Sequence, residues 1–290
     1  MKRSYLYLKL RFAGLSTIQI YNLCKLFPHF LTAPFNDQHQ LLSRFLSMSK
    51  ITHSATISQK FQTETITQIL TTLNNSQTHF VSIDQCHYPS ILREIYQPPL
   101  ILFYRGRTDL LSLPHTLAVI GSRHATHYSY QALDMLFQSL QAHRFCIVSG
   151  LAKGADCYAH QCAMYWQMPT IAVLGFGHNH HYPKETAQVR QYIEQNGIVI
   201  SEYLPDDPPK KYYFPQRNRI ISGISKGVLI TESMERSGTL ITTQFALEQN
   251  RKVYILPGSI FDPMVKGNLL SAQEGAKIVI NAMDIIEDYI

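Results

Sequence analysis

The stretch of this chain with the most chemical potential runs from residue 210 to residue 219. It gathers four cationic and three aromatic side chains within ten positions: Lys210, Lys211, Tyr212, Tyr213, Phe214, Arg217 and Arg219. Sites that bind single-stranded nucleic acid use this mixture, because cations neutralise phosphates and aromatic rings stack on bases. Pro215 is also a favourable first residue of a helix, so a solvated helix end is the alternative. The stretch predicts a nucleic-acid contact at the start of a helix.

A second stretch places Ser237, Gly238 and Thr239 at the start of a helix that continues to Gln249. Free backbone N–H groups and the helix dipole favour a phosphate at such a turn. A plain N-cap explains Ser237 equally well. The turn is a candidate phosphate contact of moderate specificity.

Motifs of common nucleotide enzymes and hydrolases are missing or out of context. No GxGxxG follows a predicted strand and no GxxxxGK[ST] occurs, which argues against a dinucleotide site and a P-loop. Residues 223–227 match the hydrolase pattern GxSxG, but they lead from a helix into a strand, and no histidine follows His181. We interpret Ser225 as a chance match.

Histidines at 178, 180 and 181 form a cluster in which a metal is conceivable, but no convincing Cys or carboxylate set lies nearby. We prefer a polar loop. Glu202 and Glu232 follow predicted strands and would suit an acid–base pair. Because no nucleophile accompanies them, we predict that they cap helices or hold Arg217 and Arg219. No catalytic residue, metal or cofactor is expected.

After residue 77, short apolar runs alternate with helix-length amphipathic stretches. This alternation predicts a mainly parallel sheet covered on both faces, the doubly wound α/β architecture. The predicted strands are 117–120, 145–149, 171–174, 198–201, 228–231, 253–256 and 277–280. Ligands of such sheets bind beyond the carboxyl ends of the strands. Glycine-rich segments such as 121–123 and 150–154 follow those ends, so we predict an anion-binding rim there.

The first 77 residues differ from the rest of the chain in the spacing of their apolar residues and in net charge. Apolar residues at helical spacing predict helices over 16–27, 36–48 and 57–73. Eight Lys and Arg stand against two acidic residues in this segment, so the net charge of +6 lies there. Such charge suits a polyanionic partner and equally serves solubility. We predict two domains, 1–77 all-helical and 78–290 α/β.

Composition bounds the class of protein. The 290 residues, 45% hydrophobic and 16% charged, suffice for a packed core. Five cysteines without a CxxC pair argue against a disulfide framework. No apolar run would span a bilayer, and the first residues lack a signal-peptide pattern. We expect a cytoplasmic protein without membrane contact.

Several motifs occur together in one order: 121–123, 149–156, 182–183, 201–202, 214–223, 237–242, 257–259, 267–270 and 275–276. In this order they resemble the DNA-processing protein A family, DprA or Smf, over about residues 79 to 281. The resemblance implies an extended Rossmann-like domain that binds single-stranded DNA without a dinucleotide. It also implies protection of incoming DNA during natural transformation and help in loading the recombinase RecA.

Further expectations follow from the same resemblance. It implies a homodimer formed through the Rossmann-like domain. The apolar run at 278–290 is the feature of this sequence that supports such an interface. The first segment is similar to the sterile-alpha-motif-like (SAM-like) module that precedes this domain in some members. Because the chain stops about ten residues after its last predicted strand, we expect no C-terminal winged helix.

The resemblance and the motifs together define the predicted DNA contacts. They are Arg123, Gly150, Lys153, Lys211, Phe214, Arg217, Asn218, Arg219, Ser237, Gly238 and Thr239. Two other functions stay open, a Rossmann-like nucleotide phosphoribohydrolase and a nucleotide-sensing module. The hydrolases carry a Pro-Gly-Gly-x-Gly-Thr turn followed by a glutamate. Here residues 235–239 lack the Pro-Gly-Gly, and no acidic residue follows on that helix before Glu248.

Overall fold

The computed structural model of the protein describes residues 2–235 and 237–290. Within this part of the chain, five helices come first: α1 (Arg3–Ala13), α2 (Thr17–Leu26), α3 (Phe35–Met48), α4 (Ser54–Thr63) and α5 (Ile66–Asn75). The strands are β1 (His79–Ser82), β2 (Ile101–Gly106), β3 (Thr116–Ile120), β4 (Cys146–Ser149), β5 (Thr170–Leu174), β6 (Ile198–Ser201), β7 (Gly227–Ile230), β8 (Lys252–Ile255) and β9 (Lys277–Ile278). The later α-helices are α6 (His127–Leu140), α7 (Ala155–Tyr165), α8 (Ala187–Asn196), α9 (Tyr213–Gly223), α10 (Thr239–Glu248), α11 (Lys266–Gln273) and α12 (Met283–Ile286).

The strands form one sheet in the order β1-β2-β6-β5-β4-β3-β7-β8-β9. Every neighbouring pair is parallel except those of β2, which runs antiparallel to both β1 and β6. Each of the seven predicted strands overlaps an observed one, so the mainly parallel sheet is confirmed. The pair β1 and β2 was not predicted, and it extends the sheet beyond β6.

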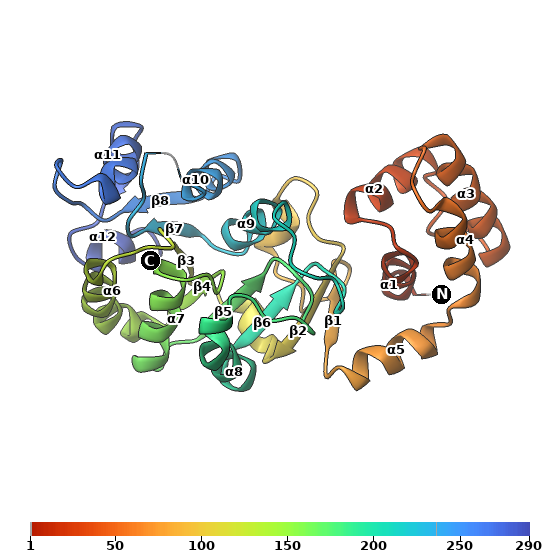
Figure 1. Ribbon diagram of the computed structural model, residues 1–290, viewed down its shortest axis with the longest axis horizontal. Helices are drawn as coiled ribbons and strands as arrows, with labels where there is room; N and C mark the ends of the chain where they lie inside the picture. The colour runs from red at the N-terminus through yellow and green to blue at the C-terminus, as the bar shows by residue number, and fades with distance from the viewer. Residues whose placement is uncertain (1, 236) are drawn as a thin grey trace.

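Residues of the central strands alternate between two apolar layers, as the pleat requires. Ala118 and Ile120 of β3 pack with α9 and α10 on one face. Leu117 and Val119 pack with α6, α7 and α12 on the other. Figure 1 shows these two groups of helices on opposite sides of the sheet. The doubly wound, Rossmann-like architecture is therefore confirmed.

The N-terminal helices gather at the end of the molecule where β1 and β2 lie (Figure 1). Their core is not closed on itself, since Leu100, Ile101 and Phe103 belong to the same apolar cluster. The segment 57–73 was predicted as one helix, and this is wrong. Thr65 begins a new helix through a capping box with Gln68, which ends α4 at Thr63.

The first helix, α1, was also not predicted. The change from helices to strands falls between the end of α5 and the start of β1. We retain residue 77 as the proposed domain boundary. In the described residues, no helix combines the length and the apolar character that crossing a membrane requires.

Candidate functional site

The connections of the sheet diverge between β3 and β7. From β3 the chain proceeds to β4 on one side, and β7 lies on the other side. Such a switch point opens a crevice beyond the carboxyl ends of the two strands, where ligands of doubly wound folds bind. Gly121, Ser122 and Arg123 follow β3 there, and Thr231 and Glu232 follow β7.

A cavity of about 370 Å³ occupies this crevice. Seven of the predicted contacts line it: Arg123, Phe214, Arg217, Asn218, Ser237, Gly238 and Thr239. A smaller adjoining cavity of about 70 Å³ shares Arg123, Phe214 and Arg217 and adds Gly150 and Lys153. We call the two together the switch-point cavity. The fold thus brings nine of the eleven predicted residues to one place, from segments up to 116 residues apart.

An exposed cation and an aromatic ring face each other in the switch-point cavity. The Arg123 guanidinium carbon lies 5.8 Å from the centre of the Phe214 ring. The ring itself is half-buried and packs against Tyr182, with centroids 5.7 Å apart, and against Phe176, at 6.4 Å. The pair offers a charge for a phosphate beside a π-face for a base.

Arg217, in contrast, lies beneath the cavity surface with 5% of the residue exposed. Its guanidinium donates to the carbonyl of Gly150 at 2.6 Å and to that of Val173. An added Cβ at Gly150 would lie 2.2 Å from Arg217 Nη1, so a larger residue there would displace the guanidinium. Gly150 and Arg217 therefore support each other, and their direct contact with DNA stays a prediction.

Asp156 lines the switch-point cavity, and we did not predict it as a site residue. It is buried in the first turn of α7, and burial raises the pKa of its carboxyl above the ordinary 3.8, while the charge of Arg217 acts in the opposite direction. The motif at 149–156 contained it, but only the fold places it beside Arg217.

Two predicted contacts lie away from the switch-point cavity. Consecutive helical residues are rotated by about 100°, so residues two apart point to nearly opposite sides. Arg219 accordingly faces away from Arg217, pairs with the buried Glu202 and donates to the carbonyl of Gln97 at 3.1 Å. Lys211 is exposed just before α9 and lines neither part of the cavity. Of these cations, only Arg217 therefore lies at the switch-point cavity, while Lys211 and Arg219 lie outside it.

The remaining predicted contacts have distinct surroundings. Lys153 is exposed and forms an ion pair with Glu185. Ser237 Oγ and Ser233 Oγ lie 2.8 Å apart, and Thr239 is the first residue of α10. A Cβ added to Gly238 would meet nothing within 4 Å. The turn at 237–239 thus offers open backbone to a ligand.

The alternatives to a binding site have structural explanations here. Glu232 caps the start of α6, accepting from the Thr126 amide at 2.7 Å and from Ser129 Oγ at 2.6 Å. Together with Glu202 bound to Arg219, this confirms the structural roles predicted for both glutamates. Ser225 is fully buried, and its hydroxyl donates to the Ile221 carbonyl at 2.9 Å, which removes it as a nucleophile.

The histidine cluster is likewise part of the fold. His178 is buried against the Phe103 carbonyl, and burial lowers its pKa to about 3. Residues 2–235 and 237–290 contain no group of three His, Cys, Asp or Glu placed to hold a metal ion. Glu248, the acidic residue considered for a phosphoribohydrolase, is exposed and does not line the switch-point cavity.

Known proteins resemble this chain over most of its length. The family model described as DNA recombination-mediator protein A matches residues 79–290. DNA processing protein DprA of Streptococcus pneumoniae is 42% identical over 210 residues, 72% of this chain and 73% of that protein. The protein of the same name from Bacillus subtilis is 38% identical over 221 residues, 76% and 74% of the two chains.

Solved structures agree with this assignment. The X-ray structure of DNA processing protein A from Streptococcus pneumoniae superimposes with a TM-score of 0.86 and 34% identity, over 99% of this chain and 98% of that one. The structure of DNA processing protein A from Helicobacter pylori is described by its single-stranded DNA binding mode. It superimposes with a TM-score of 0.65 and 29% identity, over 73% of this chain and 96% of that one. This chain belongs to the DNA recombination-mediator protein A family, DprA or Smf.

Proposed function

We propose that this protein binds single-stranded DNA at the switch-point cavity and acts as a recombination mediator. The observation that carries the proposal is the placement of Arg123 over Phe214 beside the open turn at 237–239. The Helicobacter pylori relative, whose structure is described by its single-stranded DNA binding mode, supports the same ligand. A guanidinium on a phosphate and a ring stacked on a base carry little sequence information, so binding should depend little on sequence.

A titration of single-stranded and duplex oligonucleotides by fluorescence anisotropy tests this function. With roughly three to five phosphates neutralised, log affinity for the single strand should fall with log salt with a slope of about −2 to −3.5. Arg123→Ala should reduce the slope by about 0.7 and weaken all sequences alike. Arg107→Ala is the matched control, because Arg107 is exposed and follows β2, which ends at the opposite edge of the sheet. Salt-independent binding, or equal affinity for duplex, would refute the proposal.

A base-release assay and a competition assay separate the alternative functions. Release of a base from nucleoside monophosphates would identify a phosphoribohydrolase. Mononucleotides that displace an oligonucleotide at equal concentration would identify a nucleotide sensor. A DNA-binding protein should prefer the oligonucleotide strongly, because each further phosphate and base adds free energy.

Phe214→Ala should weaken single-strand binding by about 1–3 kcal/mol, since one base loses its stacking surface. The ring also packs against Phe176 and Tyr182, so a lower Tm is expected as well. Anisotropy on the folded protein and thermal unfolding measure the two effects separately. Phe35→Ala, at a partly exposed phenylalanine of α3, is the control for general destabilisation. A lower Tm with undiminished affinity would make Phe214 a packing residue only.

We further propose that the protein protects bound DNA, helps to load RecA and works as a homodimer through the Rossmann-like domain. The apolar run at 278–290 supports a dimer in part. Its buried members Val279, Ile285 and Ile286 belong to the core, so the run is not a free surface as a whole. Exposed members remain beside the edge strand β9: Ile278, Ile280, Met283 and Ile290.

Ile280→Glu should therefore convert the dimer to a monomer in light scattering without loss of fold, because a charge at a desolvated contact is costly. Single-strand affinity should fall through lost bivalency, and RecA loading should fall further. Met48→Glu, at a comparably exposed apolar residue of α3, should change neither mass nor loading. A wild-type protein that is monomeric with and without DNA would remove the dimer.

A further inference from the structure

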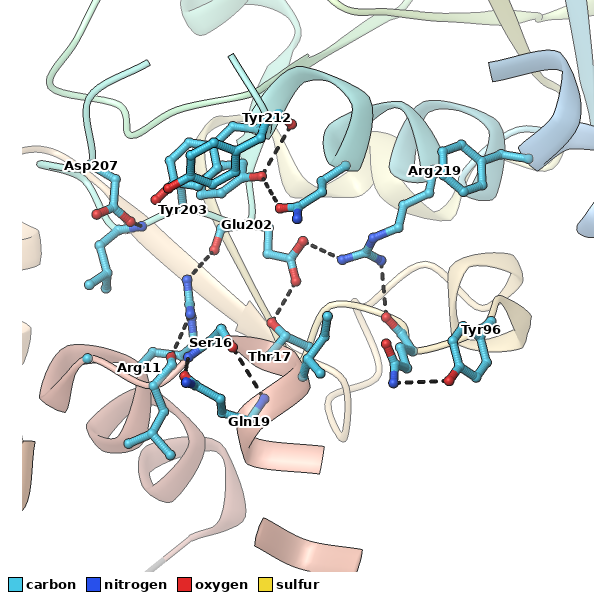
Figure 2. A pocket seen from close by; sticks show the side chains of 18 of the residues that line it. Arg11, Ser16, Thr17, Gln19, Tyr96, Glu202, Tyr203, Asp207, Tyr212 and Arg219 are labelled. Atoms are coloured by element: carbon cyan, nitrogen blue, oxygen red, sulfur yellow. Dashed lines mark hydrogen bonds and ion pairs between the residues drawn. The ribbon is translucent and has the colours of Figure 1, made fainter. Parts of the chain in front are cut away.

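A second cavity, of about 550 Å³, lies between the N-terminal helices and the α/β part. It is lined by the turn from α1 to α2, by the loop after β6 and by α9 and α10. We call it the interdomain cavity. Its volume falls in the range of ligand pockets, roughly 300–1,000 Å³. Figure 2 shows its polar centre, where Arg219, Glu202 and Thr17 meet, with tyrosines on two sides.

The walls of the interdomain cavity are suited to flat rings. Tyr203 and Tyr213 stack with centroids 4.0 Å apart and an interplanar angle of 28°. Tyr212 packs edge-on against Tyr213, at 4.7 Å, and is 58% exposed. On the other side, Tyr96 is 84% exposed. Exposed rings at the edge of a pocket gain free energy when a planar group covers them.

The interior of the cavity does not favour a phosphate. Its two lining cations are already used: Arg219 pairs with Glu202, and Arg11 donates to the carbonyls of Leu15 at 2.6 Å and Glu202 at 3.0 Å. Asp207 and Glu248 add two further carboxylates. The start of α2 is closed by a capping box between Ser16 and Gln19, so it offers no anion site.

Positive charge lies beside the cavity, on the segment just before α9, which we call the rim. Lys210 and Lys211 are exposed just before α9, and Lys210 Nζ lies 5.1 Å from the centre of the Tyr213 ring. Tyr212 precedes Phe214 by two residues, so their Cα atoms are at most about 7 Å apart. A strand that leaves the switch-point cavity at Phe214 therefore meets this rim next.

We propose that the interdomain cavity is a second subsite for the same single strand, which places bases against Tyr212 and Tyr96. Lys210 and Lys211 neutralise the adjoining phosphates at the rim. The proposal rests on single-strand binding at the switch-point cavity and extends the path of the strand along both sides of α9. It also gives the N-terminal helices a part in DNA binding, since α1 and α2 complete the cavity.

Two oligothymidylates, of about 4 and about 16 nucleotides, the span of single-strand sites, test the proposal. Tyr212→Ala with Tyr96→Ala should weaken the longer oligomer about 5- to 150-fold, the loss of stacking on one ring or more, and leave the shorter nearly unchanged. Tyr212→Phe should restore most of the affinity, because it keeps the ring. Tyr165→Ala, at a 70% exposed tyrosine of α7 outside both cavities, is the matched control.

Photocrosslinking with 5-iododeoxyuridine gives an independent readout, with crosslinks expected at Tyr212 or Tyr96. Equal losses at both lengths, or none at either, would overturn the second subsite. Failure of the proposed function looks different: the wild-type protein would bind neither oligomer, or Arg123→Ala would bind both normally. Circular dichroism of each variant keeps a folding defect from being taken for a loss of binding.

Discussion

Replacing Arg217 by alanine is expected to lower the free energy of unfolding by about 2–5 kcal/mol, because two buried carbonyls lose a charged donor at about 1–3 kcal/mol each. The change leaves Asp156 buried without its cation and takes the donor away from the carbonyls of Gly150 and Val173. Equilibrium urea unfolding measures the loss. Arg107→Ala, which removes an exposed ion pair with Asp109, should leave the free energy of unfolding nearly unchanged.

The pH dependence of this loss identifies its cause. Without Arg217, the pKa of Asp156 should rise further above 3.8, since the charge that most strongly opposes the effect of burial is gone. A carboxyl whose pKa is raised on folding binds its proton more tightly in the folded state. Stability therefore falls as the pH rises from the unfolded pKa through the folded one. The variant should be more strongly destabilised at about pH 7 than at about pH 5.

A second substitution tests the same explanation. Asp156→Asn should recover part of the stability of the Arg217→Ala variant, because it removes the unpaired charge. An Arg217→Ala protein that unfolds like the wild type and has lost only DNA affinity would show that the guanidinium reaches the ligand after all. Direct contact, as the sequence predicted for Arg217, would then be the better description.

Glu202→Ala is expected to cost about 2–4 kcal/mol, somewhat below the range for fully buried pairs because Arg219 is partly exposed. Its carboxylate joins the N-terminal helices to the α/β part, since it pairs with Arg219 of α9 and accepts from Thr17 Oγ1 of α2 at 2.6 Å. Besides urea unfolding, hydrogen exchange should show faster opening of α2 and of α9. Those segments lose the shared partner, whereas α6 and α7 do not.

Glu248→Ala is the matched control for this prediction. Glu248 lines the same interdomain cavity, but it is exposed and accepts only from Gln244 on its own helix. Its loss should change stability by less than about 0.5 kcal/mol. If Glu202→Ala and Glu248→Ala lower the free energy of unfolding equally, the carboxylate of Glu202 does not hold the N-terminal helices to the α/β part.

Local patterns in the sequence were enough for much of the α/β part. Runs such as 117–120 and 171–174 are apolar throughout because a parallel strand is buried on both faces. That pattern identified seven strands and directed attention to the segments that follow them. The switch-point cavity lies there; its Phe214 was named from the residue pattern at 210–219, and its Arg123 from the family resemblance.

The same reasoning failed where the pattern was ambiguous. The apolar run before Tyr104 belongs to β2, an antiparallel strand whose face is covered by the N-terminal helices, and we did not distinguish it from loop. The break between α4 and α5 depends on one capping box at Thr65, while the apolar spacing continues across it.

Residue patterns alone place cations, aromatic rings and glycines at the carboxyl ends of parallel strands. Which of these side chains reach a surface depends on how the chain folds. Arg217 and Arg219 look equivalent in the chain, but the helix turns them apart. The carbonyls that accept hydrogen bonds from Arg217 belong to Gly150 and Val173, which are 67 and 44 residues away in the chain. Burial of a charge depends on such distant partners, which local periodicity does not encode.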